Sequence, residues 1–416
     1  MIKLLQCLIF ISVVTFLLSC GSSNNPHLRD SMEKGELINL HVDKGTKPLI
    51  LDERTTKFTV SKIDSSQLVA EVSKILTIDG NNFILDRKTN ALFCFGLDGI
   101  FKWTYGKPGK GPEEHDALTD FSVRRDTVYL FDKLNKILKL DTLGRFIKAQ
   151  KLTIGGQWFY ADLFFVNKQG EYVFYNSDMA DSHEFAYKFL TVPPTFKKIN
   201  DVYMKKTNKE GDRRWAAGFY PVQTMTDNSG FFYTEPLNDT IYKYVDTTFT
   251  RKYAVDFGKY TLSKSYLNQN RHELSDFWKT KFGSNITSIF ETDSLLTFRT
   301  TIAGQLYYHF FRKATHEVQN FSVVLLKSGD FYASMQFIGG AENKLYFLIE
   351  PDLLMNAYKY IKKGKYNKIS DTEYRKILTK TSPLFAKLLD GTNIYSNQLI
   401  VSVNISTKDL FKSNKL

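Results

Sequence analysis

Phe83-Ile84-Leu85-Asp86 recurs 46 residues later as Tyr129-Leu130-Phe131-Asp132. A second apolar run follows each copy, first Leu92-Phe93-Cys94-Phe95 and then Ile137-Leu138-Lys139-Leu140. Each second run leads into a turn that contains Asp and Gly, and another short apolar stretch comes after the turn. Apolar runs of this length, bounded by Asp and Gly, are typical of β-strands joined by tight turns. The repeated unit is therefore predicted to be three or four short strands.

Weaker copies of the same unit continue along the chain. They begin at Tyr172-Val173-Phe174-Tyr175, Phe231–Glu235 with Ile241–Tyr244, Leu295–Phe298 with Leu306–Phe310, and Leu345–Glu350 with Gln398–Val403. Strand repeats of about 40–50 residues predict a β-propeller, in which each sheet buries its faces against its neighbours. The aromatic content of 15% suits this fold, because large flat rings fill the wedge between twisted sheets. We predict an all-β, six-bladed propeller; two wide intervals leave a seventh blade as the alternative.

Three segments do not follow the strand repeat. Leu262–Trp278 has apolar residues at nearly helical spacing, and Ser370-Asp371-Thr372-Glu373 has the pattern of a helix capping box. These helical insertions are expected either to build a binding surface on one face of the propeller or to cover its closure. Leu37–Val72 precedes the first repeat and is predicted to supply edge strands that help to close the ring.

The N-terminus has the features of a bacterial lipoprotein signal peptide. Lys3 is followed by an apolar run, Leu4–Leu18, that is shorter than the ~20 residues a transmembrane helix needs. The run ends in Leu17-Leu18-Ser19-Cys20, which resembles a lipobox, so Cys20 is predicted to be lipidated and to become the first residue of the mature chain. The predicted organisation is a signal peptide at 1–19, a lipidated tether at 20–35 and a propeller domain at 36–416.

Ser73–Ile147 resembles the six-bladed β-propeller lipoproteins of Bacteroidetes, which have NHL-like repeats. The similarity is carried by Ile78–Asp86, Gly99–Lys102 and the loop Tyr105-Gly106-Lys107-Pro108-Gly109-Lys110-Gly111-Pro112-Glu113-Glu114-His115. The loop resembles a Gly-x-x-Gly-x-Gly-Pro-Gly-Glu sequence between the first two blades of that family, with Glu113 in place of the usual Gly. The resemblance implies a lipid-anchored propeller and little about its ligand.

The glycine-rich part of this loop, Gly106–Gly111, also invites comparison with a phosphate-binding loop. Such a loop places its lysine after the last glycine and leads into a helix. Here Lys110 precedes Gly111, Pro112 lacks an N–H group, and strands follow. A crossover between two blades is the preferred interpretation.

Candidate chemical groups are few. Asp86, Asp132 and Glu235 follow equivalent strands and could form a carboxylate ring around the axis, although acids at strand ends more often cap turns. Cys94 is expected to be a buried small side chain. The seven histidines are widely separated, and the sequence contains no recognisable metal-binding or catalytic motif. We therefore predict no catalytic, cofactor or metal residues, with cation ligands drawn from several blades as the alternative.

The formal net charge of +12 is spread over single basic residues and short clusters, the longest being Lys362-Lys363-Gly364-Lys365. This pattern does not predict a nucleic-acid partner. The leading functional hypothesis is a non-catalytic, ligand- or protein-binding module attached to the cell envelope. The alternatives are an envelope hydrolase or lyase with a site in the axial channel, and an accessory subunit of a nutrient-uptake complex. Gly21 after Cys20 favours the outer membrane, and the lack of acidic residues in Ser22–Asn25 favours its periplasmic face.

Overall fold

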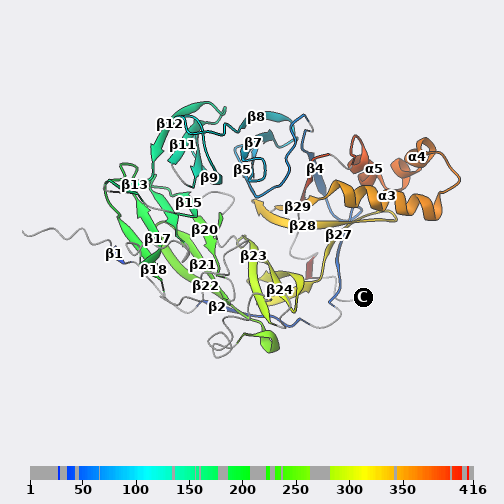
Figure 1. Cartoon of the computed structure of the whole chain (residues 1–416). Helices are drawn as coiled ribbons and strands as arrows, with labels where there is room; N and C mark the ends of the chain where they lie inside the picture. The colour runs from blue at the N-terminus through cyan, green and yellow to red at the C-terminus, as the bar shows by residue number, and fades with distance from the viewer. Residues whose placement is uncertain are drawn as a thin grey trace, which may run out of the picture.

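The computed structural model describes residues 27–28, 35–42, 46–64, 66–133, 136–154, 156–158, 161–176, 186–206, 222–224, 230–235, 238–262, 282–341, 344–393, 396–404 and 410–411. Six sheets are arranged in a ring, and three α-helices of the described chain lie together outside it (Figure 1). The fold is a six-bladed β-propeller, as the sequence predicts.

The first three blades follow one another along the chain. Blade 1 contains β5 (Lys74–Ile78), β6 (Asn81–Asp86), β7 (Ala91–Gly96) and β8 (Phe101–Tyr105). Blade 2 contains β9 (Leu118–Arg124), β10 (Thr127–Asp132), β11 (Lys136–Asp141) and β12 (Phe146–Lys151). A small hairpin, β13 (Thr153–Ile154) and β14 (Gln157–Trp158), leads to blade 3 with β15 (Leu163–Val166), β16 (Tyr172–Tyr175), β17 (Tyr187–Val192) and β18 (Asp201–Lys205).

The last three blades carry the larger additions. Blade 4 contains β19 (Val222–Thr224), β20 (Gly230–Tyr233), β21 (Thr240–Val245) and β22 (Thr248–Asp256), followed by a 3-10 turn at Gly258–Tyr260. Blade 5 contains β23 (Gly283–Glu291), β24 (Leu295–Ile302), β25 (Gln305–Arg312) and β26 (Glu317–Phe321). Blade 6 is built from β28 (Phe331–Ala341), β29 (Lys344–Ile349), β30 (Leu399–Asn404) and the N-terminal β4 (Phe58–Lys62), with β27 (Val324–Ser328) paired to the first half of β28.

Tight hairpins set the order of strands within the blades. Asp79-Gly80, between β5 and β6, and Ala303-Gly304, between β24 and β25, each have two consecutive positive φ angles, of 48° and 73° and of 50° and 76°. This backbone geometry belongs to the type I′ turn, whose twist matches that of the flanking strands. Because such turns leave no room for a crossover, consecutive strands pair antiparallel.

The N-terminal segment closes the ring from outside. It adds β1 (His27–Leu28) to β18, β2 (Glu36–Asn39) to β22 and β3 (Leu49–Asp52) to β27, all parallel, and then β4 to β30 antiparallel. These strands cover outer edges that would otherwise present unpaired backbone groups to other chains. The edge strands predicted within Leu37–Val72 are thereby confirmed.

Aromatic side chains fill the space between blades. At the interface of blades 3 and 4, the ring of Phe189 lies 4.6 Å from Phe249 and 4.8 Å from Tyr233, and Phe231 lies 4.9 Å from Tyr244, measured between centroids. All five rings are buried. The wedge between twisted sheets therefore accounts for the high aromatic content.

The helices form one insertion between β29 and β30. They are α3 (Pro351–Lys365), α4 (Asp371–Thr381) and α5 (Pro383–Leu389). The capping box predicted at Ser370 is confirmed, because its hydroxyl accepts the Glu373 N–H at 3.2 Å and the Glu373 carboxylate accepts the Ser370 N–H at 3.1 Å. Phe331 of β28 stacks on Phe385 of α5 at 4.0 Å, which fixes the insertion to blade 6. The helix expected at Leu262–Trp278 falls in a part of the chain outside the described residues, apart from Leu262.

Candidate functional site at the propeller axis

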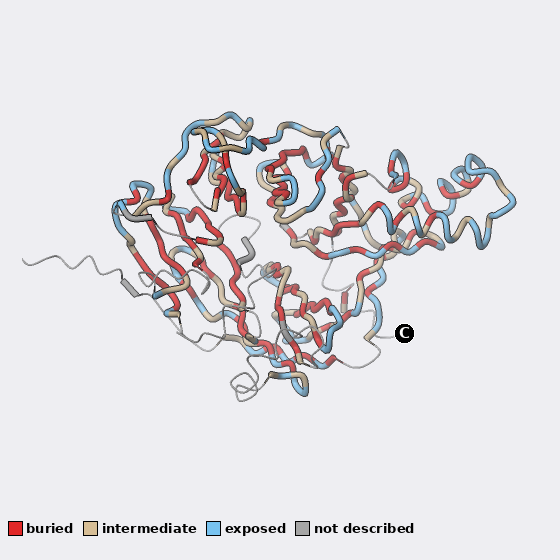
Figure 2. The backbone as a smooth tube through the Cα atoms, in the orientation of Figure 1, coloured by how far each residue is buried: buried red, intermediate tan, exposed pale blue. Residues whose placement is uncertain are grey.

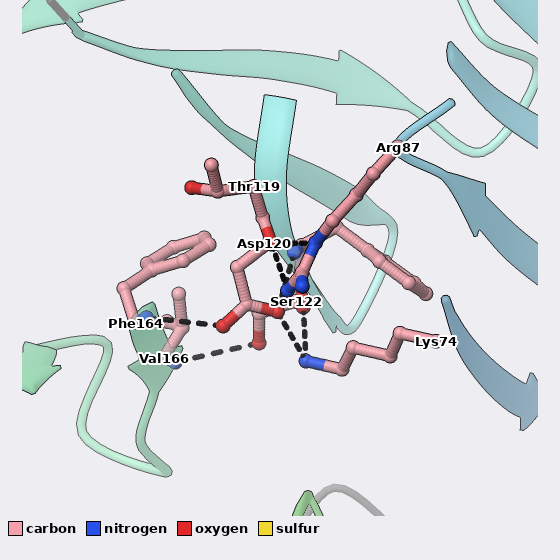
Figure 3. Close-up of polar contacts among 8 residues, drawn as sticks. Lys74, Arg87, Thr119, Asp120, Ser122, Phe164 and Val166 are labelled. Carbon is pink, nitrogen blue, oxygen red and sulfur yellow. Dashed lines mark hydrogen bonds and ion pairs between the residues drawn. The ribbon is translucent and has the colours of Figure 1, made fainter. Parts of the chain in front are cut away.

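The first strand of each blade lies nearest the axis, where β9 contacts β15 and β23 contacts β28. The inward edge of such a strand has backbone N–H and C=O groups with no further strand to bind. Polar side chains of blades 1 and 2 bind these backbone groups on β9 of blade 2 and β15 of blade 3, and they form the candidate site (Figure 3).

Asp120 of β9 is the centre of this site. Its side chain is only 4% exposed, and its carboxylate lies 2.6 Å from Nζ of Lys74 on β5. The same carboxylate accepts the backbone N–H of Phe164 on β15 at 3.1 Å and that of Phe121 at 2.8 Å. One carboxylate thus links blades 1, 2 and 3 (Figure 3).

Further donors from blade 1 bind the backbone carbonyls of β9. Lys74 Nζ also donates to the Phe121 carbonyl at 2.7 Å, and Arg87 Nε donates to the Thr119 carbonyl at 2.9 Å. On the other side of β9, Ser122 Oγ accepts the N–H of Val166 at 3.3 Å. The edges of β9 and β15 are therefore satisfied by side chains of the preceding blade.

The electrostatics of the site follow from its burial. Burial lowers the pKa of the Lys74 ammonium, and the adjacent Asp120 carboxylate opposes that shift. A buried charge is tolerated when it is paired and hydrogen-bonded, as both groups are here. The pair is thus a structural bridge whose charges are already neutralised by the protein.

The same type of bridge recurs around the ring. A lysine of one blade pairs with an acid of the next at Lys133 and Asp162, 3.0 Å apart, at Lys188 and Glu235, and at Lys243 and Glu291, 2.6 Å apart. Together with Lys74 and Asp120, these pairs join blades 1 to 5 in succession.

Glu291 is the most heavily engaged acid of this series. Besides Lys243 it contacts Lys313 at 2.7 Å and the hydroxyl of Tyr253. Burial raises the pKa of Glu291, but the hydrogen bonds from Lys243 and Lys313 outweigh this effect and hold the pKa at about 2. Glu291 is therefore an ionised carboxylate enclosed by cations.

Sequence comparison identifies the family. Residues 63–384 match the model described as a domain of unknown function, DUF4934. The chain belongs to this family. No curated protein matches it in sequence.

Solved structures extend the comparison to the fold. A Bacteroides fragilis protein described as a putative exported protein aligns with a TM-score of 0.65 and 19% identity, over 91% of this chain and 100% of its own. A DUF4221 member from Bacteroides vulgatus aligns at 0.46 and 9% identity, over 70% of this chain and 91% of its own. A streptogramin B lyase aligns at 0.38 and 15%, over 70% and 83%. The first of these three structures, with 19% identity, shows a shared fold and nothing about function.

The acids singled out in the sequence of this DUF4934 member have structural partners. Asp86 accepts the backbone N–H groups of Lys88 and Thr89 at 2.8 and 3.0 Å, and of Ala70 at 2.7 Å. Asp132 accepts those of Asp116 and Ala117 at 3.0 and 3.2 Å. Asp86 thus caps the turn that follows it, as the sequence favours. The donors to Asp132 instead lie 15 and 16 residues earlier, in the loop before β9.

Glu235 differs from Asp86 and Asp132. It accepts the hydroxyl of Tyr233 at 2.8 Å and pairs with Lys188, so it is an inter-blade partner and not a turn cap. Within the described part of the chain, no three His, Cys, Asp or Glu side chains lie close enough together to hold a metal ion.

The glycine-rich loop joins β8 to β9 and is a blade-to-blade crossover, as predicted. The N–H of Lys107 donates to Nε2 of the buried His115 at 3.0 Å, and the N–H of Gly109 donates to the His115 carbonyl at 2.9 Å. The Glu114 carboxylate accepts the N–H of Gly111 at 2.7 Å. These loop groups are bonded within the loop itself, which opposes the phosphate-loop interpretation.

The two cysteines considered in the sequence differ in whether the structure describes them. Cys94 is buried in β7, and burial raises its pKa to about 11, as expected of an inert small side chain. Cys20 lies outside the described residues. No described helix is both long and apolar enough to span a bilayer.

Sequence reasoning missed the inter-blade pairs, although a signal for them exists. Lys74 and Asp120 are 46 residues apart, Lys188 and Glu235 are 47 apart, and Lys243 and Glu291 are 48 apart. Each separation equals about one blade, the period shown by Asp86 and Asp132. Opposite charges separated by one repeat length are therefore the sequence signal for these inter-blade pairs.

Proposed function

We propose that this protein is a lipid-anchored cell-envelope propeller that binds a ligand or a protein partner without catalysing a reaction. Its N-terminal sequence, ending in Leu-Leu-Ser-Cys at Cys20, supports export and lipidation. The likeness of the fold to that of a protein described as exported is consistent with this location. The membrane is proposed to be the outer membrane, with the protein on its periplasmic face, and the repeats to be of the NHL-like type.

The observation that carries the binding role is the state of the charged groups at the axis. Lys74, Arg87 and Asp120 are each bonded to other groups of the protein. An acid or base catalyst must reach the proton that it transfers in a bound substrate. Groups that hold neighbouring blades together cannot take this role without breaking the interface, so a binding surface is favoured over a reaction centre.

A ligand screen tests the binding role. The chain from Gly21 keeps every described residue, and its melting temperature would be measured with oligosaccharides, peptides and divalent metals. A ligand at 100 times its Kd adds about 2.7 kcal/mol to stability, enough to shift the melting curve. A shift with a sugar or peptide supports a small-ligand receptor. A shift with metal alone, followed by hydrolase or lyase activity, would refute the non-catalytic role.

The anchor is tested separately in cells. Labelled palmitate should be incorporated into the full chain and recovered with the outer-membrane fraction, whereas Cys20→Ala should abolish both. Ser19→Ala is the matched control, because it keeps a small residue before the cysteine and should be labelled. Equal labelling of the Cys20→Ala variant and the unmodified chain would refute lipidation at this residue. Copurification with a membrane transporter would identify the partner as an uptake complex.

A further inference from the structure

The helical insertion carries half of the protein's formal net charge. Residues 351–389 contain nine basic and three acidic side chains, a net charge of +6 in 39 residues of a chain whose total is +12. The insertion stands outside the ring of blades beside β27 and β28 (Figure 1). The charge is therefore displayed on a projecting part of the molecule.

The three acids of the insertion are already engaged. Asp352 accepts the N–H of Leu353 at 2.8 Å at the start of α3, Asp371 pairs with Lys362, and Glu373 belongs to the capping box. Outside the insertion, Asp330 pairs with Lys365 at 2.8 Å. Two of the nine basic side chains are therefore neutralised by acids.

Six lysines of the insertion are exposed and have no acidic partner among the described residues: Lys359, Lys363, Lys368, Lys376, Lys380 and Lys387. Tyr360, next to Lys359 on the outer face of α3, is 82% exposed, and Leu353 on the same helix is 48% exposed. In Figure 2 the tube is pale blue at many residues of α3 and α4, which marks these residues as exposed. Lys363 lies three residues after Tyr360 on α3, so the two exposed side chains are neighbours on the helix surface.

We propose that the α3–α5 insertion binds the anionic surface of a lipid bilayer. Lysines attract acidic headgroups, and tyrosine is favoured at the boundary between headgroups and acyl chains because its ring is apolar and its hydroxyl is polar. The choice of a bilayer over an acidic protein rests on the proposed lipid anchor, which would hold the chain at a membrane and raise the local concentration of headgroups. The insertion is then a second membrane contact that orients the propeller.

The strength of the contact is set by the number of lysines near the surface. Each contributes about a fivefold factor in the binding constant near an anionic leaflet, so four together give more than a hundredfold when the factors are independent. This attraction falls off within a Debye length, about 8 Å at physiological ionic strength, and weakens as salt is added.

Vesicle cosedimentation of the chain from Gly21 tests the inference without the lipid anchor. Vesicles contain phosphatidylcholine alone or with 30% phosphatidylglycerol. The insertion variant removes four lysines: Lys359→Gln, Lys363→Gln, Lys376→Gln and Lys380→Gln. The control variant removes four exposed lysines outside the insertion, leaving the same net charge: Lys57→Gln, Lys148→Gln, Lys197→Gln and Lys198→Gln.

We expect binding to the phosphatidylglycerol vesicles only, a loss of at least tenfold in the insertion variant, and less than threefold in the control variant. Binding should also disappear in 0.5 M NaCl. Equal effects of the two variants would show that net charge alone acts, and would overturn the inference. The inference would also be overturned if the unmodified chain did not bind the phosphatidylglycerol vesicles. If the chain bound immobilised polyglutamate but not these vesicles, the result would favour an acidic protein as the partner. Because Cys20 is absent from this chain, none of these outcomes depends on lipidation.

Discussion

Asp120 provides a sharp test of how the blades are held together. Replacing it with alanine removes the counter-ion of Lys74 and the acceptor of the Phe164 N–H, both within the protein interior. Removing one partner of a buried ion pair costs about 3–5 kcal/mol, and an unpaired buried N–H adds about 1–3 kcal/mol. Lys74 keeps its bond to the Phe121 carbonyl, and its lowered pKa eases loss of the proton. We therefore expect Asp120→Ala to lower the free energy of unfolding by about 3–5 kcal/mol.

Urea unfolding of the chain from Gly21 measures this loss, and a double-mutant cycle isolates the ion pair. Lys74→Met should cost less than Asp120→Ala, because Asp120 retains its two backbone donors. In the double variant the two losses should not add, with a coupling energy above about 1.5 kcal/mol, as for groups in one network. Glu113→Ala is the control, since Glu113 and its partner Lys107 are each 51% exposed; it should cost less than about 1 kcal/mol.

A loss below about 1 kcal/mol for Asp120→Ala would refute this reasoning, because it is the value expected of a solvent-exposed pair. Additive single losses would equally refute it. They would mean that Lys74 and Asp120 stabilise the protein independently and that the bridge between blades 1 and 2 contributes no coupling.

Three further outcomes are expected. His309 is buried between Thr300 and Asn320, and burial lowers its pKa to about 4. Because the unfolded chain binds a proton at His309 more readily than the folded protein does, the free energy of unfolding should fall by roughly 3 kcal/mol as the pH drops from 6.5 towards 4. Unfolding free energies from pH 7 to 4.5 should show this slope, and His309→Gln should flatten it; an unchanged slope would exclude His309 as its source. A chain that starts at Asp64 lacks β1 to β4 and exposes the edges of β18, β22, β27 and β30, so it should aggregate in size-exclusion chromatography where the chain from Gly21 does not. Cys94 should react with a thiol reagent only on unfolding, because it is fully buried with a raised pKa; rapid labelling of the native protein would contradict its placement.

Much of the architecture followed from local patterns. The period between Asp86 and Asp132 and the recurrence of apolar runs predicted the blades, because strand and turn preferences act over a few residues. The pairing of Leu345–Ile349 with Leu399–Val403 was anticipated from the repeat although three helices separate the two strands. The role of Glu235 was not anticipated, because its partner Lys188 lies in the preceding blade.

The sequence by itself determined the repeat unit, the turn-capping role of Asp86, the crossover loop and the need for N-terminal strands to complete the ring. Each of these depends on the character of a short segment. Only the tertiary structure decided which cation meets which carboxylate, because Lys74 and Asp120 become neighbours only when two blades pack side by side. It also decided that the basic helices stand outside the ring, since the stacking of Phe331 on Phe385 joins parts of the chain more than 50 residues apart. Such contacts depend on how whole sheets are placed in space, which no local propensity specifies.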